Sequence, residues 1–139
     1  ATKNEVRLSE NGDVLVQLSM RDATRSSGLP VIVEERAVER IGLALGYATW
    51  LLERIDSTHR LSHLAISARL AGEGALAWRT ESEHSASPNS VSSHTWRNDE
   101  AARDLPVQLN PPHMVRATLT MNRARIIEDL LVLIRRRWR

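Results

Sequence analysis

The segment from Val33 to Asp56 constrains the fold most, because it carries the longest helical pattern in the chain. Apolar residues recur along it every three or four positions, which places them on one face of an α-helix. This row consists of Ile41, Leu45, Ala48, Leu52 and Ile55. Glu34 and Glu35 stand in the first turn, where the helix dipole favours negative charge. We therefore predict a long amphipathic helix whose apolar face needs a partner surface.

Segments with alternating apolar residues on both sides of this helix predict β-hairpins. Residues 6–20 alternate around Asn11-Gly12, a pair that suits a type I′ turn. After the helix, Leu64–Leu70 and Ala75–Thr80 alternate around the turn residues of 72–74. Each pair of alternating segments is therefore expected to form an antiparallel pair of strands.

The C-terminal part combines an irregular region with two further elements. Residues 81–113 are rich in serine and proline, and we expect one short strand or an ordered excursion within them. Met114–Met121 alternates and predicts a strand. Arg123–Trp138 has a helical apolar face and predicts a helix, with Asn122 as its N-cap.

These elements predict an α+β domain that spans residues 1–139. The expected architecture is a mostly antiparallel sheet of about five strands in the order ββ-α-ββ-β-α, with two helices packed on one face. A length of 139 residues is typical of one domain. Because the chain lacks an initiator Met and any self-contained active-site motif, we expect it to be a fragment of a longer protein.

Composition excludes several classes of protein. The chain has no cysteine, which excludes thiol catalysis, zinc–thiolate sites and disulfides. The pI of about 9.9 overstates the attraction to nucleic acid, because the net charge is only +2 and nearly all basic residues are arginine. The uncharged stretch Ile41–Leu52 is too short to cross a bilayer, so no membrane contact is expected. We expect a cytoplasmic protein of bacterial type.

Positive charge is concentrated at the C-terminus. Residues 116–139 carry seven arginines against Glu128 and Asp129, whereas the rest of the chain is net negative. Candidate nucleic-acid contacts are the phosphate-binding arginines and a tryptophan that would stack on a base: Arg135, Arg136, Arg137, Arg139 and Trp138. The alternative is that these arginines merely favour a helix C-terminus while the tryptophan closes the core.

Histidines are candidates for a ligand pocket. Those in or beside the irregular region lie near acidic residues in the sequence, and loops over a rigid sheet often form binding sites. They are His84, His94 and His113. The alternative is a set of solvated loop side chains. The spacing of His59 and His63 does not match a metal motif, and no metal, cofactor or catalytic residue is predicted.

Two features suggest contact between copies of the chain. Gly42 and Gly46 form a flat strip on the predicted helix, suited to close packing on this chain's own strands, on another helix or on a second copy. Leu64 and Ile66 belong to a strand that could pair across a two-fold axis.

Three functional hypotheses follow. The first is a non-catalytic assembly or partner-binding domain of a larger protein, acting as a homodimer or with a partner protein. The second is an accessory domain of a nucleic-acid-associated regulator that uses the C-terminal arginines. The third is a small-ligand binder or enzyme with a pocket under residues 81–113.

Overall fold

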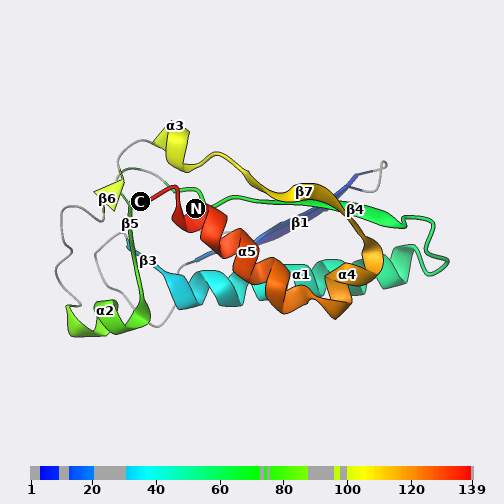
Figure 1. The fold of residues 1–139 in the computed structure, drawn as a ribbon, viewed down its shortest axis with the longest axis horizontal. Coiled ribbons are helices and arrows are strands. Elements are labelled where there is room, and N and C mark those ends of the chain that lie inside the picture. Colours follow the sequence, from blue (N-terminus) through cyan, green and yellow to red (C-terminus); the bar gives the residue numbers. More distant parts are fainter. Residues whose placement is uncertain are drawn as a thin grey trace.

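The computed structural model describes residues 4–9, 13–20, 31–72, 74, 76–87, 96–97 and 100–138. It has an α+β fold, as the sequence predicts (Figure 1). The elements in chain order are β1 (Glu5–Leu8), β2 (Val14–Gln17), β3 (Val31–Val33), α1 (Glu34–Ile55), β4 (His63–Ala68), β5 (Leu76–Arg79), α2 (Glu81–Ala86), β6 (Trp96–Arg97), α3 (Glu100–Arg103), β7 (Val107–Val115), α4 (Arg116–Met121) and α5 (Arg123–Arg135).

The described strands form three small sheets, so the predicted single sheet of about five strands is wrong in strand count and order. β1 pairs with β2, β4 pairs with β7, and β5 lies between β3 and β6. The β3–β5 pair is parallel and the other pairs are antiparallel. In Figure 1, α5 lies across the front of the space between α1 and the β4–β7 pair, while β1 and β2 lie behind. The two long helices therefore pack against each other, and they do not together cover one face of a sheet.

The N-terminal hairpin is confirmed. β1 and β2 are antiparallel, with Val6 opposite Val16 and Leu8 opposite Val14. The predicted turn at Asn11-Gly12 lies outside the described residues.

The second predicted hairpin is wrong, because its two strands pair with distant segments. β4 pairs with β7, and β5 pairs in parallel with β3. The guanidinium of Arg103 donates hydrogen bonds to the carbonyl oxygens of Gly72 (2.5 Å) and Gly74 (2.7 Å). The carbonyls of Gly72 and Gly74, which lie in the predicted hairpin turn, therefore accept hydrogen bonds from a residue about 30 positions later in the chain.

The strand predicted at Met114–Met121 is also wrong over most of its length. β7 ends at Val115, and α4 follows. Arg116 and Leu119 are buried, whereas Met121 is 80% exposed. The two buried residues are three positions apart, as on one face of a helix. Leu119 also belongs to the alternating pattern of Met114–Met121, so this pattern alone could not distinguish a strand from a helix. Residues 81–113 contain α2, β6, α3 and most of β7.

The two long helices are confirmed close to their predicted limits. α1 spans Glu34–Ile55, and α5 spans Arg123–Arg135. After α5 the chain continues in tight turns, with the amide of Trp138 donating to the carbonyl of Arg135 at 3.0 Å. Asn122 occupies the N-cap position, but its side chain makes no capping hydrogen bond.

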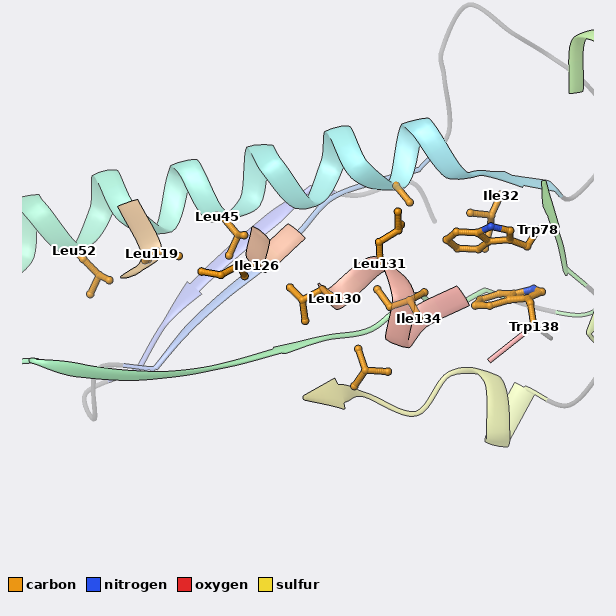
Figure 2. Packing of buried hydrophobic residues seen from close by; sticks show 12 residues of the cluster. Ile32, Leu45, Leu52, Trp78, Leu119, Ile126, Leu130, Leu131, Ile134 and Trp138 are labelled. Atoms are coloured by element: carbon orange, nitrogen blue, oxygen red, sulfur yellow. The ribbon is translucent and has the colours of Figure 1, made fainter. Parts of the chain in front are cut away.

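The core lies between α1, α5 and the strands around them (Figure 2). Its central residues come from α1, α4 and α5: Leu45, Leu52, Leu119, Ile126, Leu130, Leu131 and Ile134. At one end Trp78 of β5 lies beside Trp138, with ring centroids 5.4 Å apart. Among the helices described, none is long and apolar enough to span a membrane.

Candidate functional site

The C-terminal arginines have different surroundings. Arg135 is partly buried and paired with Glu34 at the start of α1. Arg136 is exposed, and Arg137 donates a hydrogen bond to the carbonyl of Pro106 at 3.3 Å. Arg139 lies outside the described residues. Of the candidate arginines that the structure describes, Arg136 is therefore exposed and Arg137 is partly exposed at the end of α5.

Trp138 is a core residue. It is 4% exposed, and its indole N–H donates to the carbonyl of Leu76 at 3.1 Å. The guanidinium carbon of Arg103 lies 5.9 Å from the centre of its ring. The predicted base-stacking role of Trp138 is therefore wrong for this conformation, because its ring is covered on both sides by protein.

Arg136 and Arg137 line an open concavity of about 700 Å³. Its other walls come from the β4–β7 pair, the segment before β7 and α5: Ser67, Pro106, Val107, Gln108 and Leu133. The concavity therefore combines two cationic side chains with an apolar and amide surface, which suits an anionic group attached to an uncharged body.

The candidate histidines are not brought into one site by the described residues. His84 is buried on α2, where its Nδ1 contacts the guanidinium of Arg79. His113 is exposed on β7, opposite Ala65. His94 lies outside the described part of the chain. Within the residues that the structure describes, no group of three His, Asp or Glu side chains is placed to hold a metal ion.

The two candidate glycines face α5. A Cβ on Gly42 would lie 3.6 Å from Ile127 Cδ1, and one on Gly46 would lie 3.4 Å from Arg123 Nη1. The predicted strip is therefore used, but inside the chain and against a helix. Packing on another helix, one of the predicted partners of the strip, is what α5 provides, whereas packing on this chain's own strands is not found; contact between copies stays a prediction.

The β4 strand keeps part of its predicted role open. Leu64 and Ile66 are partly buried and pack against the core. β4 has β7 on one side and no second partner among the described strands. Leu64 and Ile66 are therefore used inside the fold, and a contact between copies along the other edge of β4 stays a prediction.

An exposed apolar row on α1 was not predicted from the sequence. Leu43, Tyr47 and Trp50 are 52%, 41% and 51% exposed. At about 3.6 residues per turn, this row lies on the side of the helix opposite the buried positions Leu45 and Leu52. The uncharged stretch Ile41–Leu52 carries the signal, because a helix that is apolar on two opposite faces has one face too many for a single core.

The outer row of α1, defined as Leu43, Tyr47 and Trp50, is an ordered surface. The rings of Tyr47 and Trp50 lie 5.6 Å apart, and the guanidinium carbon of Arg54 lies 5.2 Å from the centre of the Trp50 ring. Toward the other end of the helix, Arg36 donates to Glu39 at 3.1 Å. The row is thus an apolar centre with charged residues at both ends, as in the anatomy of protein interfaces.

A polar cluster lies where α1 ends. The Asp56 carboxylate accepts hydrogen bonds from the backbone amides of Leu61 (2.8 Å) and Arg60 (3.0 Å) and from Arg116 Nη1 (2.6 Å). The amide of Leu61 first, then that of Arg60 and the charge of Arg116, lower the pKa of Asp56 below its ordinary value, against the opposing effect of burial. Three hydrogen bonds therefore hold this carboxylate between the end of α1, the segment before β4 and the start of α4. The backbone carbonyl of Asp56 accepts a fourth from the same Arg116 nitrogen at 3.1 Å.

A small cavity of about 80 Å³ adjoins this cluster and is lined by Thr49, Leu52, Glu53, His59, Arg116, Ala117, Leu119 and Thr120. Glu53 lies 3.7 Å from both His59 Nε2 and Arg116 Nη2. The positive charge of Arg116 is thus paired closely with Asp56 and more distantly with Glu53. The cavity is far smaller than the several hundred Å³ of ordinary ligand pockets. This arrangement is suited to holding the fold together.

Comparison of the chain with protein family models, curated proteins and solved structures finds no match. Two described surfaces have a clear binding chemistry: the outer row of α1 and the concavity at Arg136 and Arg137.

Proposed function

We propose that this chain is a non-catalytic assembly domain that binds another protein surface, in the first instance its own, through the outer row of α1. The observation that carries this proposal is the exposure of about half of Leu43 and Trp50 and much of Tyr47 on one continuous helix face. Contiguous apolar surface of this kind is uncommon on monomeric proteins away from binding sites.

The residue types support a protein partner. Tyrosine and tryptophan are enriched at the centres of protein interfaces, where they bury a large area with few rotatable bonds. Removing the remaining exposed half of one such side chain from water contributes roughly 1 kcal/mol. The neighbouring Arg54, which lies over the Trp50 ring, limits the water contact of one face of that ring even in the free chain.

Unpaired strand edges add a weaker argument of the same kind. The β1–β2 and β4–β7 pairs are each two-stranded within the described residues. Two-stranded sheets are marginal alone, and open edges are often covered in assemblies. Val6, Leu8 and Leu15 on the first pair are also 43–50% exposed.

Sedimentation velocity over a wide concentration range tests the proposal. We expect the wild type to associate and the double variant Leu43→Ser/Trp50→Ser to remain monomeric. Leu105→Ser is a matched control, because Leu105 is 53% exposed but lies outside α1, between α3 and β7. A wild type that stays monomeric throughout, or a double variant that associates as the wild type does, would refute the proposal.

A second candidate function is polyanion binding at the concavity beside Arg136 and Arg137. Its support is that both side chains line the same open space. Charge-driven binding to phosphates weakens steeply with salt. We therefore expect single-stranded or duplex nucleic acid to bind at low salt and Arg136→Ser/Arg137→Ser to abolish this binding. Arg60→Ser/Arg125→Ser removes the same charge from exposed positions elsewhere and should bind as the wild type does.

A further inference from the structure

We infer that the occupant of the outer row of α1 is a second copy of the same helix, packed antiparallel across a two-fold axis level with Gly46 and Tyr47. This inference rests on the proposed assembly function and adds the identity of the partner and the register of the contact. It uses three described properties of α1: the spacing of the row, the unequal size of its ends and the charges beyond those ends.

Spacing comes first. Leu43, Tyr47 and Trp50 are separated by four and three residues, the alternation with which a helix presents a narrow seam to another helix. Tyr47 is near the middle of α1, and the row has a small end at Leu43 and a large end at Trp50. An antiparallel pair centred between Gly46 and Tyr47 places Leu43 of each copy against Trp50 of the other. The Trp50 ring of each copy is then matched with the smaller Leu43 of the other, and the two Tyr47 rings meet near the axis.

Charge supports the same register independently of the apolar residues. The axis that places Leu43 opposite Trp50 also places Glu39 of each copy level with Arg54 of the other. Both residues are exposed, and they lie about 22 Å apart along one helix, just beyond the two ends of the apolar row. The two-fold axis produces two such contacts between opposite charges, one at each end of the interface.

A parallel pair is disfavoured by the same residues. It would place Glu39 against Glu39, Arg54 against Arg54 and the two Trp50 rings against each other. Like charges across an interface are repulsive, and the seam would be crowded at one end and loose at the other. Self-complementarity is therefore a property of the antiparallel arrangement.

The expected dimer is weak. One helix pair of this length falls below the roughly 1,200–2,000 Å² that stable protein interfaces bury. Association should accordingly depend on concentration. This makes the dissociation constant measurable, so that single charge changes at the rim can be detected.

Charge reversal tests the register. Glu39→Arg makes both end contacts repulsive and also removes the ion pair of Glu39 with Arg36 of its own chain. The dissociation constant measured by sedimentation equilibrium should rise roughly tenfold at low salt. Arg36→Gln, which removes only the pair within the chain, should change the constant much less. In Glu39→Arg/Arg54→Glu, the two opposite-charge contacts are restored with reversed sign, and affinity should return to within about threefold of the wild type. Glu128→Arg reverses an exposed charge on α5 and should leave the constant unchanged. Circular dichroism of each variant checks that α1 remains folded.

The outcomes separate this inference from the function on which it rests. Weakening by Glu39→Arg together with recovery in the double reversal supports the antiparallel dimer. If Leu43→Ser/Trp50→Ser abolishes association but Glu39→Arg has no effect, the register is refuted and the assembly function stands. If the wild type is monomeric at every concentration, both are refuted.

Discussion

At the scale of single residues, three buried arginines link segments that are distant in the chain or in the fold. Arg79, Arg103 and Arg116 are 3%, 1% and 6% exposed. Arg103 joins Gly72, Gly74 and Asp104, and Arg116 joins the end of α1 to the start of α4. The planar guanidinium can reach several acceptors at once, which an ammonium group cannot do in the same geometry. A high arginine content is thus weak support for nucleic-acid binding here.

Arg103 gives the first prediction at this scale. Arg103→Lys keeps the charge but cannot reach the carbonyls of Gly72 and Gly74 and the Asp104 carboxylate together, so at least one of these part-buried hydrogen bonds is lost. We expect the free energy of unfolding, measured with urea, to fall by roughly 2–3 kcal/mol. Arg125→Lys, at a side chain that is 80% exposed, should change it very little. An equal and small effect of both substitutions would contradict the role assigned to Arg103.

Asp56 gives a pH-dependent prediction. Its pKa is lowered in the folded chain, so the folded state binds a proton less readily than the unfolded state does. The carboxylate therefore contributes stability above its ordinary pKa of 3.8, and this contribution is lost as the pH falls through the lowered folded-state value. Asp56→Asn should reduce the melting temperature at neutral pH, with a difference from wild type that shrinks in acid.

The measurement is the melting temperature of both proteins from neutral pH down to strongly acidic pH. Asp129→Asn is the control, because Asp129 is half-exposed and its one described ion pair, with Arg125, is 3.8 Å long. A difference between wild type and Asp56→Asn that stayed constant over the whole range would show that the carboxylate charge is not what stabilises this junction.

At the scale of elements, local patterns predicted which segments are strands or long helices better than they predicted pairing. The alternation in Leu64–Leu70 correctly indicated a strand, but nothing in it specifies β7 as the partner. The segment after β4 is instead held by a long-range contact, because Arg103 lies 31 and 29 residues beyond the two glycine carbonyls to which it donates. α4 was missed because Leu119 fits both an alternating and a helical pattern, and the burial of Arg116 depends on Asp56, which is 60 residues away.

The α1–α5 contact gives a prediction for the two glycines of α1 that face α5. Gly42 is in a helix interior, where alanine is favoured by about 1 kcal/mol, and the added Cβ would meet Ile127 Cδ1 at an ordinary contact distance of 3.6 Å. Gly42→Ala should therefore stabilise the fold by about 0.5–1 kcal/mol in urea unfolding. Gly46→Ala brings the Cβ to 3.4 Å from Arg123 Nη1, whose neighbour Nη2 donates to Thr49 Oγ1, so a smaller gain is expected. A loss of stability in Gly42→Ala would mean that α1 and α5 require a closer approach.

At the scale of the whole molecule, the candidate surfaces were only partly predictable. The C-terminal arginine cluster could be found from charge alone, and two of its members do line a concavity. For Trp138 the sequence allowed both a base-stacking and a core position, and only the fold decides for the core, because the surroundings of its ring are created by Trp78 and the carbonyl of Leu76 from another part of the chain. The outer row of α1 required knowledge of which helix face the core uses. Only the fold distinguishes Leu45 and Leu52 from Leu43 and Trp50.

The separation of the two faces of α1 leads to a prediction that distinguishes assembly from folding. Leu43 and Trp50 are about half exposed in the single chain, so replacing both with serine should lower the stability of the monomer by roughly 2 kcal/mol, which is the contribution of their buried halves. A dimer, in contrast, stabilises the folded state by mass action, so its melting temperature rises with protein concentration. We expect the melting temperature to rise with concentration in the wild type and in Leu105→Ser, whereas in Leu43→Ser/Trp50→Ser it should be moderately lower and independent of concentration. If the double variant melted far below the others even at high dilution, the outer row would be part of the monomer's own packing, and its exposure would no longer indicate a partner.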